Sequence, residues 1–293
     1  MSTPAAPSGP SPQTDAPTCY RHPNRETWVR CTRCDRPICP DCMQEASVGF
    51  QCPECVAAGR RSTRPVRTAF GGAVSSSGAV VTKALIGLNV LVFLATAANG
   101  LSIFGDNGSP IYRRFALVPL AVADGQWYRL VTAAFLHYGL LHIAFNMYVL
   151  LMLGAQLERL LGRWRYLALY LVAGVGGNAL AYLISPLGTA SAGASGAIFG
   201  LFAAYFVVAR KMRADTGQIV GLIVINLVLT FAIPSISVGG HIGGLVTGGI
   251  AGLALAYAPA GSRRTAVQVA GLVGVLLVEV AVVLVRTAAL TGS

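Results

Sequence analysis

The chain has 293 residues, of which 54% are hydrophobic and only 11% are charged. A soluble domain of ordinary composition has about a quarter charged residues, so the whole chain is not expected to be one soluble domain. Much of the charge and all seven cysteines lie in 1–67, whereas long apolar runs dominate from residue 79 onward. We therefore expect a soluble N-terminal segment followed by a polytopic membrane domain.

The N-terminal segment predicts a disordered tail over 1–17 and a metal-binding module over 18–57. The tail is rich in Pro, Ser and Ala and lacks the apolar core of a signal peptide. The module contains four pairs of potential ligands with a gap of two residues: Cys19 and His22, Cys31 and Cys34, Cys39 and Cys42, Cys52 and Cys55. Two such pairs complete a closed tetrahedral site, which is typical of structural zinc. We expect two structural zinc ions here.

The spacing of these pairs favours an interleaved arrangement, because only four residues separate Cys34 from Cys39. The first and third pairs would then share one ion, and the second and fourth the other. The module resembles a B-box-type cross-brace finger, although its last pair is two cysteines where many B-boxes have histidines, so the pairing stays open. Closed sites leave no position for a substrate, and the module has no clear basic and aromatic platform. We expect a scaffold that binds a cytosolic protein, with no nucleic-acid partner; free or redox-active thiols are the alternative.

A flexible linker is predicted over 58–79, which contains two arginines in a row, four glycines and three consecutive serines. The membrane domain is predicted over 80–293. Its seven apolar stretches, of which the fourth and fifth are the shortest, are 80–98, 140–158, 166–185, 195–210, 217–234, 239–257 and 266–285.

The distribution of Lys and Arg indicates the orientation of these spans. One side of the membrane would have Arg64, Arg67, Lys83, Arg159, Arg163, Arg165, Arg210, Lys211, Arg213, Arg263 and Arg264. The other side would have only Arg113, Arg114, Arg129 and Arg286. We therefore expect a multi-pass protein of the cell membrane with a cytoplasmic N-terminus and a C-terminus on the outer side. The net charge of +11 then reflects topology and a weak attraction to anionic lipids.

Polar residues inside spans are costly and therefore suggest function. Ser195 begins the fourth span within a Gly-Ala-Ser-Gly sequence, and His241 begins the sixth. His142 and Asn146 are four residues apart, on one face of the second span. With alternating spans, these positions all come to the outer side at similar depth. A serine nucleophile needs a neighbouring base, which His241 can supply. His142, Asn146 and the backbone amide of Ser195 can stabilise an oxyanion.

Other residues limit the alternatives for this chemistry. Glu279 is the only acidic residue well inside a span, and it lies in the seventh, so a Ser-His dyad fits better than a triad. Lys83 and Lys211 lie at the inner boundary, which disfavours a Ser-Lys pair. Small-x-x-x-small rows on the fourth and sixth spans would let the two helices approach closely; these rows are Gly196 with Gly200 and Gly244 with Gly248.

Over about 85–270 the sequence resembles the rhomboid family of intramembrane proteases. The GxSG motif matches at Ser195, and the general-base motif matches at His241, Gly244 and Gly248. Further matches are His142, Asn146, His137, Trp127-Tyr128-Arg129, Glu158 and Gly162, and Phe199 replaces a tyrosine that packs on the base in some members. The seventh span matches the larger members, and the zinc module lies outside the resemblance. The fold expected is an all-α, six-helix rhomboid core with one extra C-terminal transmembrane helix.

The resemblance implies a serine endopeptidase that needs no cofactor and cleaves single-span transmembrane proteins near the outer side of the membrane. Its partners would be those substrates and the lipid bilayer. A catalytically silent rhomboid-like binder or adaptor is the main alternative, and the presence of both Ser195 and His241 counts against it. A transporter or channel is a third possibility; proton-coupled transport would depend on Glu279 instead of Ser195.

Overall fold

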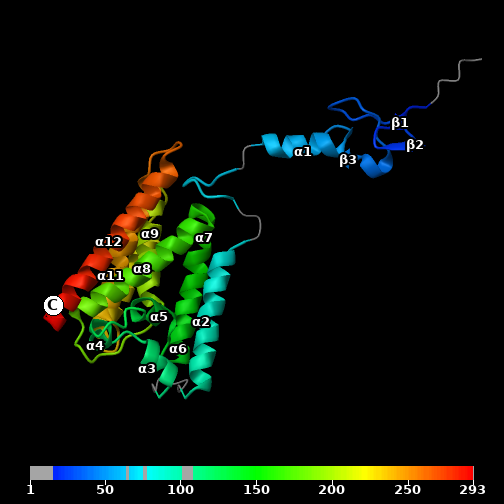
Figure 1. The fold of residues 1–293 in the computed structure, drawn as a ribbon. Coiled ribbons are helices and arrows are strands. Elements are labelled where there is room, and N and C mark those ends of the chain that lie inside the picture. Colours follow the sequence, from blue (N-terminus) through cyan, green and yellow to red (C-terminus); the bar gives the residue numbers. More distant parts are fainter. Residues whose placement is uncertain (1–15, 64–65, 75–77, 101–107, 293) are drawn as a thin grey trace, which may run out of the picture. The chain divides into compact units, whose positions relative to one another are not determined.

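The computed structural model describes residues 16–63, 66–74, 78–100 and 108–292. The predicted tail lies outside the described residues except for its last two positions. The chain divides into two compact units, Met1–Pro65 and Val66–Ser293. Figure 1 shows a small unit with short strands and the helix α1, and a larger unit made of helices.

The first unit is organised around its cysteines rather than around an ordinary apolar core. Its elements are the antiparallel strands β1 (Thr18–Cys19) and β2 (His22–Glu26), the turn η1 (Pro40–Cys42), the antiparallel strands β3 (Gln44–Glu45) and β4 (Phe50–Gln51), and the helix α1 (Pro53–Ser62). Six buried cysteines and Ile38 form the core cluster. Cys52 caps α1, since its sulfur accepts a hydrogen bond from the amide of Cys55, and Pro53 occupies the first helical position.

The second unit has a helix in each of the seven predicted spans. These helices are α2 (Val80–Ala98), the continuous series α6 (Leu140–Val149), η3 (Leu150–Gly154) and α7 (Ala155–Leu161), then α8 (Arg163–Ile184), α9 (Ser195–Lys211), α10 (Gly217–Ala232), α11 (Val238–Tyr257) and α12 (Arg264–Thr291). Five of the seven are long and apolar enough to cross a membrane. The other two, α9 and α10, are shorter, as predicted for the fourth and fifth spans. The helical fold with its extra C-terminal helix is confirmed.

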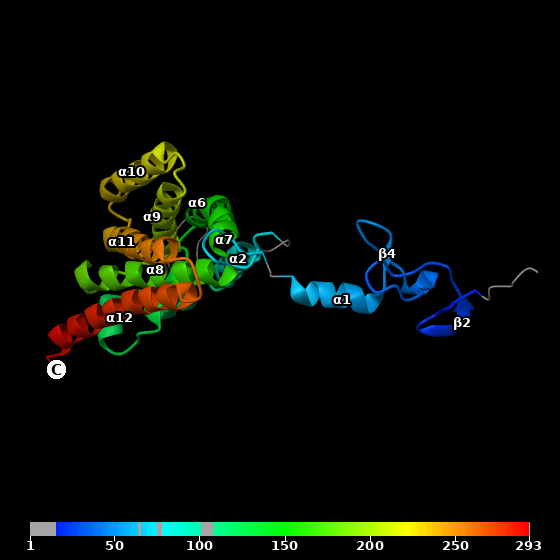
Figure 2. The same ribbon diagram turned by 90° about the horizontal axis from the view of Figure 1, so that it is seen from above.

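The helix α11 packs between α8 and α9, and glycines make this close packing possible. A Cβ atom on Gly244 would lie only 1.9 Å from the carbonyl oxygen of Gly196, and one on Gly248 would lie 2.2 Å from Cα of Gly200. The predicted small-residue rows therefore face each other across the α9–α11 crossing. Figure 2 shows α10 next to α9 at one side of this bundle and α12 next to α8 at the other.

The connection between α2 and α6 contains the short helices α3 (Pro110–Phe115), α4 (Pro119–Ala123) and α5 (Arg129–Thr132), and the turn η2 (Ala133–Phe135). The guanidinium of Arg129, which is 6% exposed, donates to the carbonyl oxygens of Arg113 and Ala116 and to the side chain of Gln126. Arg129 therefore holds this loop together through its hydrogen bonds.

Glu158 acts as a helix cap. Its carboxylate accepts hydrogen bonds from the amides of Val81 and Thr82 and from the Thr82 hydroxyl, at 2.8 to 3.0 Å. These amides are in the first turn of α2 and have no partner within the helix. Glu158 thus joins α7 to α2.

The predicted flexible linker over 58–79 needs correction in two places. The helix α1 continues to Ser62, and the turn 66–74 packs on the membrane unit. Within that turn Phe70 is 2% exposed, and its carbonyl oxygen accepts a hydrogen bond from Gln268 on α12. A Cβ on Gly72 would lie 2.3 Å from the carbonyl oxygen of Leu161, so a glycine is needed there. Burial of an apolar side chain such as Phe70 is favourable even where the neighbouring residues in the sequence are small and typical of a linker.

The packing of this turn predicts different outcomes for two truncations. Deleting 1–65 removes the first unit alone, whereas deleting 1–78 also removes Phe70 and its hydrogen bond to Gln268. Loss of a buried phenylalanine costs about 3 kcal/mol or more, which corresponds to a drop in melting temperature of roughly 5 °C or more. We expect the drop only in the shorter protein, measured by thermal unfolding in detergent. Equal melting temperatures would show that the turn contributes nothing to stability.

Candidate functional site

Ser195 is the first residue of α9 and follows a loop that is fixed by a backbone hydrogen bond. The amide of Gly193 donates to the carbonyl oxygen of Ala133, at 2.9 Å, and Gly193 has a positive φ of 147°. A Cβ on Gly193 would lie 2.8 Å from Cε1 of His142 and 3.4 Å from Oγ of Ser195. The absence of a side chain at Gly193 therefore leaves room for the His142 ring, and the serine hydroxyl and this ring face the same small space.

His241 lies in the first turn of α11 and is 8% exposed. Its ring stacks on Phe199, with centroids 4.0 Å apart and an angle of 19° between the planes. The predicted packing of Phe199 on the candidate base is therefore observed. At the edge of the same ring, Nδ1 lies 2.7 Å from Oγ1 of Thr230 on α10. Sequence analysis did not single out Thr230, because a threonine in an apolar helix is unremarkable by itself.

His142 and Asn146 lie on the same face of α6, as predicted. The Asn146 side-chain amide donates to the carbonyl oxygen of His142, at 2.8 Å, which leaves its second N–H for another acceptor. The His142 ring stacks on Tyr138 at 4.1 Å, and the buried His137 ring lies 5.0 Å from it.

A cavity of about 320 Å³ brings four of the predicted residues together, since its wall includes Ser195, His241, His142 and Asn146. Most of the remaining wall is apolar; it includes Phe145, Ile198, Phe199, Phe202, Leu229 and Ile233. No acidic side chain of the described chain lines this cavity. A second hollow of about 610 Å³ shares Tyr138, Ser191 and 235–237 with it. The polar cluster is thus enclosed by apolar groups and adjoins a hollow lined mostly by loop residues.

Glu279 lies elsewhere in the bundle. Its carboxyl is at the contact of α12 with α8, where a Cβ on Gly176 would lie 2.6 Å from Oε1 of Glu279 and 2.4 Å from the Thr247 side chain. Glu279 does not line the cavity with Ser195. A third member of a triad is therefore not supplied by Glu279.

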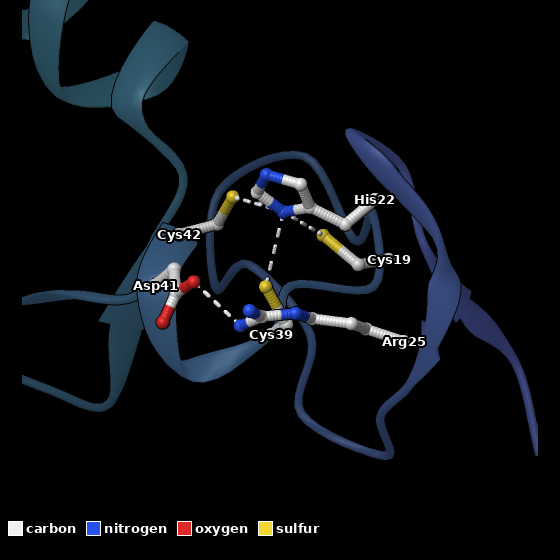
Figure 3. A network of polar contacts seen from close by, with 6 residues as sticks. All are labelled: Cys19, His22, Arg25, Cys39, Asp41 and Cys42. Carbon is white, nitrogen blue, oxygen red and sulfur yellow. Dashed lines mark hydrogen bonds and ion pairs between the residues drawn. The ribbon is translucent and has the colours of Figure 1, made fainter.

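The eight predicted metal ligands form two clusters in the first unit. The first consists of Cys19, His22, Cys39 and Cys42, and the second of Cys31, Cys34, Cys52 and Cys55; within each cluster the ligand atoms lie within 4.8 Å of one another. This is the interleaved grouping that the short spacer favours. Figure 3 shows the four side chains of the first cluster converging, with the Arg25–Asp41 ion pair beside them.

The distances in these clusters fit a tetrahedral ion. Nδ1 of His22 lies 3.8, 3.2 and 3.4 Å from the sulfurs of Cys19, Cys39 and Cys42. With zinc–ligand bonds of about 2.0 Å to nitrogen and 2.3 Å to sulfur, a tetrahedron has N···S edges of about 3.5 Å and S···S edges of about 3.8 Å. The sulfurs of Cys34 and Cys52 are 3.7 Å apart. Both clusters can therefore hold a metal ion.

The thiols of the first cluster differ in acidity. Burial would raise the pKa of the Cys19 thiol, but hydrogen bonds from the backbone of Cys39, Arg21 and His22 and from the His22 ring outweigh burial and lower it to about 6. Burial, together with the neighbouring Cys19 and Cys39, raises the pKa of Cys42 to about 11. One thiolate thus makes the next harder to form, a repulsion that a bound divalent cation would relieve.

Comparison with known proteins places the site in a family context. Residues 124–258 match the sequence model of the Rhomboid domain. The chain is 40% identical over 186 residues to rhomboid protease GluP of Bacillus subtilis, which covers 62% of this chain and 36% of GluP. It is 37% identical over 134 residues to putative rhomboid protease YdcA of the same organism, covering 44% of this chain and 67% of YdcA. It is 33% identical over 148 residues to rhomboid-type serine protease 2 of Emericella nidulans, covering 48% of this chain and 29% of that protein.

Proposed function

This chain belongs to the rhomboid family, and on that premise we propose that it is an intramembrane serine endopeptidase that cleaves single-span transmembrane proteins. The observation that carries the proposal is the cavity whose wall includes Ser195, His241, His142 and Asn146. The chain spans about a third of the length of GluP and two thirds of that of YdcA. The activity of this chain is therefore a proposal that rests on its own site residues.

In the proposed mechanism Ser195 is the nucleophile and His241 the general base. The imidazole takes the hydroxyl proton as Oγ attacks the carbonyl carbon of the substrate, and it returns that proton to the amine that leaves. Water then hydrolyses the acyl-enzyme with His241 again as base. The second hollow, lined by loop residues, gives a route for this water. No cofactor is required for these steps.

The oxyanion of the tetrahedral intermediate would be stabilised by His142, by the free N–H of Asn146 and by the backbone amide of Ser195 at the start of α9. Such donors, fixed in an apolar enclosure, typically contribute factors of about 100 to 1,000 to kcat each. His142 is well placed for this because Gly193 lets its ring lie beside Ser195.

The substrate class follows from the apolar wall of the cavity. A membrane-spanning helix could place apolar side chains there, but its amides are hydrogen-bonded and shielded. Substrates whose helices unwind easily near the outer surface would therefore be preferred. We also propose the orientation predicted from Lys and Arg, in which the N-terminus is cytoplasmic and the C-terminus lies outside.

For the N-terminal module we propose two structural zinc ions and the binding of a cytosolic protein. Zinc is favoured because the donors are three cysteines and one histidine in one cluster and four cysteines in the other, at tetrahedral spacing. With all four positions filled by protein, the ions would stabilise the module and would take no part in proteolysis.

The test of the protease is labelling of the purified, detergent-solubilised chain with a fluorophosphonate probe. We expect the wild type to be labelled and both Ser195→Ala and His241→Ala to lose labelling completely, because the probe reacts only with an activated serine. Glu279→Gln should be labelled like the wild type, whereas proton-coupled transport would require Glu279. A folded wild type that neither labels nor cleaves a transmembrane peptide would instead favour the catalytically silent binder.

A further inference from the structure

We propose that Thr230 is a positioning residue, which holds the His241 imidazole in the tautomer whose Nε2 is free to accept the serine proton. The inference rests on the proposed protease function. Thr230 lies on α10, is 1% exposed, and has its Oγ1 2.7 Å from Nδ1 of His241. Within α10 only Ile219 and Thr230 are buried, so the Thr230 hydroxyl is the buried polar side-chain group of this helix.

The second contact of the Thr230 hydroxyl determines the direction of the first. Oγ1 also lies 2.7 Å from the carbonyl oxygen of Asn226, one turn earlier on α10. A hydroxyl has one proton to donate, and a carbonyl oxygen can only accept. Both contacts are hydrogen bonds only if Thr230 donates to Asn226 and accepts from the Nδ1–H of His241. In the opposite tautomer the hydroxyl could donate to only one of the two acceptors, so one of these two hydrogen bonds would be lost, which is unfavourable.

This function is not supplied by the other neighbour of the ring. Stacking on Phe199 fixes the plane of the imidazole, at 19° between the planes, but it does not distinguish Nδ1 from Nε2. No acidic side chain of the described residues lines the cavity to orient the base in the way that a triad carboxylate does. The hydroxyl of Thr230 therefore keeps the proton on Nδ1. It leaves Nε2, the nitrogen that faces away from α10, without a proton.

Three variants test the role. Thr230→Val keeps the shape and removes the hydroxyl, and Thr230→Ser restores the hydroxyl on a smaller side chain. Thr96→Val is the matched control, because Thr96 is 0% exposed and its hydroxyl also bonds to carbonyl oxygens of its own helix, but it is in α2 and has no hydrogen bond to a histidine of the described residues. The probes are the rate of fluorophosphonate labelling and the kcat and KM for a transmembrane peptide.

We expect Thr230→Val to lower the labelling rate and kcat about tenfold, the effect of losing one orienting hydrogen bond, with KM and melting temperature near wild type. Thr230→Ser should recover most of the rate, and Thr96→Val should change neither. A wild-type rate in Thr230→Val, or an equal loss in Thr96→Val, would overturn the inference.

A readout independent of activity separates this inference from the proposed function. Nitrogen-15 NMR of histidine-labelled protein, with His241→Ala to assign the signal, reports which ring nitrogen bears the proton. We expect the proton on Nδ1 in the wild type and a mixture of tautomers in Thr230→Val. A wild type with the proton on Nε2 would refute the role of Thr230, whereas a wild type that never labels would refute the protease proposal.

Discussion

Substituting alanine for Gly244 should lower fluorophosphonate labelling of Ser195 at least about 100-fold. The new Cβ would lie 1.9 Å from the carbonyl oxygen of Gly196 and 2.7 Å from its carbonyl carbon. Both are backbone atoms, so no side chain can turn aside and the helices α9 and α11 must separate. Ser195 begins one of these helices and His241 lies in the first turn of the other. A displacement of about 1 Å between reacting groups costs about two orders of magnitude in rate.

The matched control for this substitution is Gly274→Ala in α12. A Cβ on Gly274 would have no atom within 4 Å, and alanine is a better helix former than glycine. We expect this variant to label at the wild-type rate and to melt at the same temperature or slightly higher. Circular dichroism distinguishes loss of geometry from loss of fold in Gly244→Ala. Wild-type labelling of Gly244→Ala would mean that the crossing of α9 and α11 does not set the distance between the dyad residues.

The positions of the membrane helices follow from the sequence because apolar runs must match the thickness of a bilayer. The first span was predicted at 80–98, the bounds of α2. The seventh was predicted to end at 285, yet α12 continues through Arg286 to Thr291. A single charged residue at the end of a helix interrupts the apolar run without ending the helical hydrogen bonding, so a prediction from hydropathy alone stops too early.

The candidate site was predictable as a set of residues, and much less so as a network. Ser195 and His241 carry recognisable chemistry at the starts of two spans, and alternation of the spans places them on one side. Thr230 has no such signature, because its importance comes only from the position of its hydroxyl between Asn226 and His241. The turn around Phe70 was missed for the opposite reason: its glycines suggested flexibility, whereas Gly72 provides close contact with Leu161.

Removal of the two proposed zinc ions should unfold the first unit while the membrane unit keeps its structure and its labelling. The core of the first unit is six buried cysteines and Ile38, so without ions it has almost no apolar packing of its own. Structural zinc contributes about 10–16 kcal/mol to the folded state of small modules, which exceeds what so small a core supplies. After treatment of the full chain with a chelator, we expect hydrogen–deuterium exchange to show loss of protection over 18–62 and none over 80–292.

Because the clusters are interleaved, the loss of either ion should be enough to unfold the whole first unit. Along the chain the ligand pairs alternate between the two clusters, so an ion in either cluster would close a loop that contains ligands of the other. Cys39→Ser, which affects the first cluster, and Cys52→Ser, which affects the second, should therefore each expose all of 18–62 to exchange and lower the zinc content by more than one ion per chain. Ser47→Ala, an exposed position outside both clusters, is the control and should retain two. Loss of a single ion with protection kept around the other would mean that the two sites fold independently. A purified chain that contains no zinc but is fully protected from exchange would show that metal does not stabilise this unit.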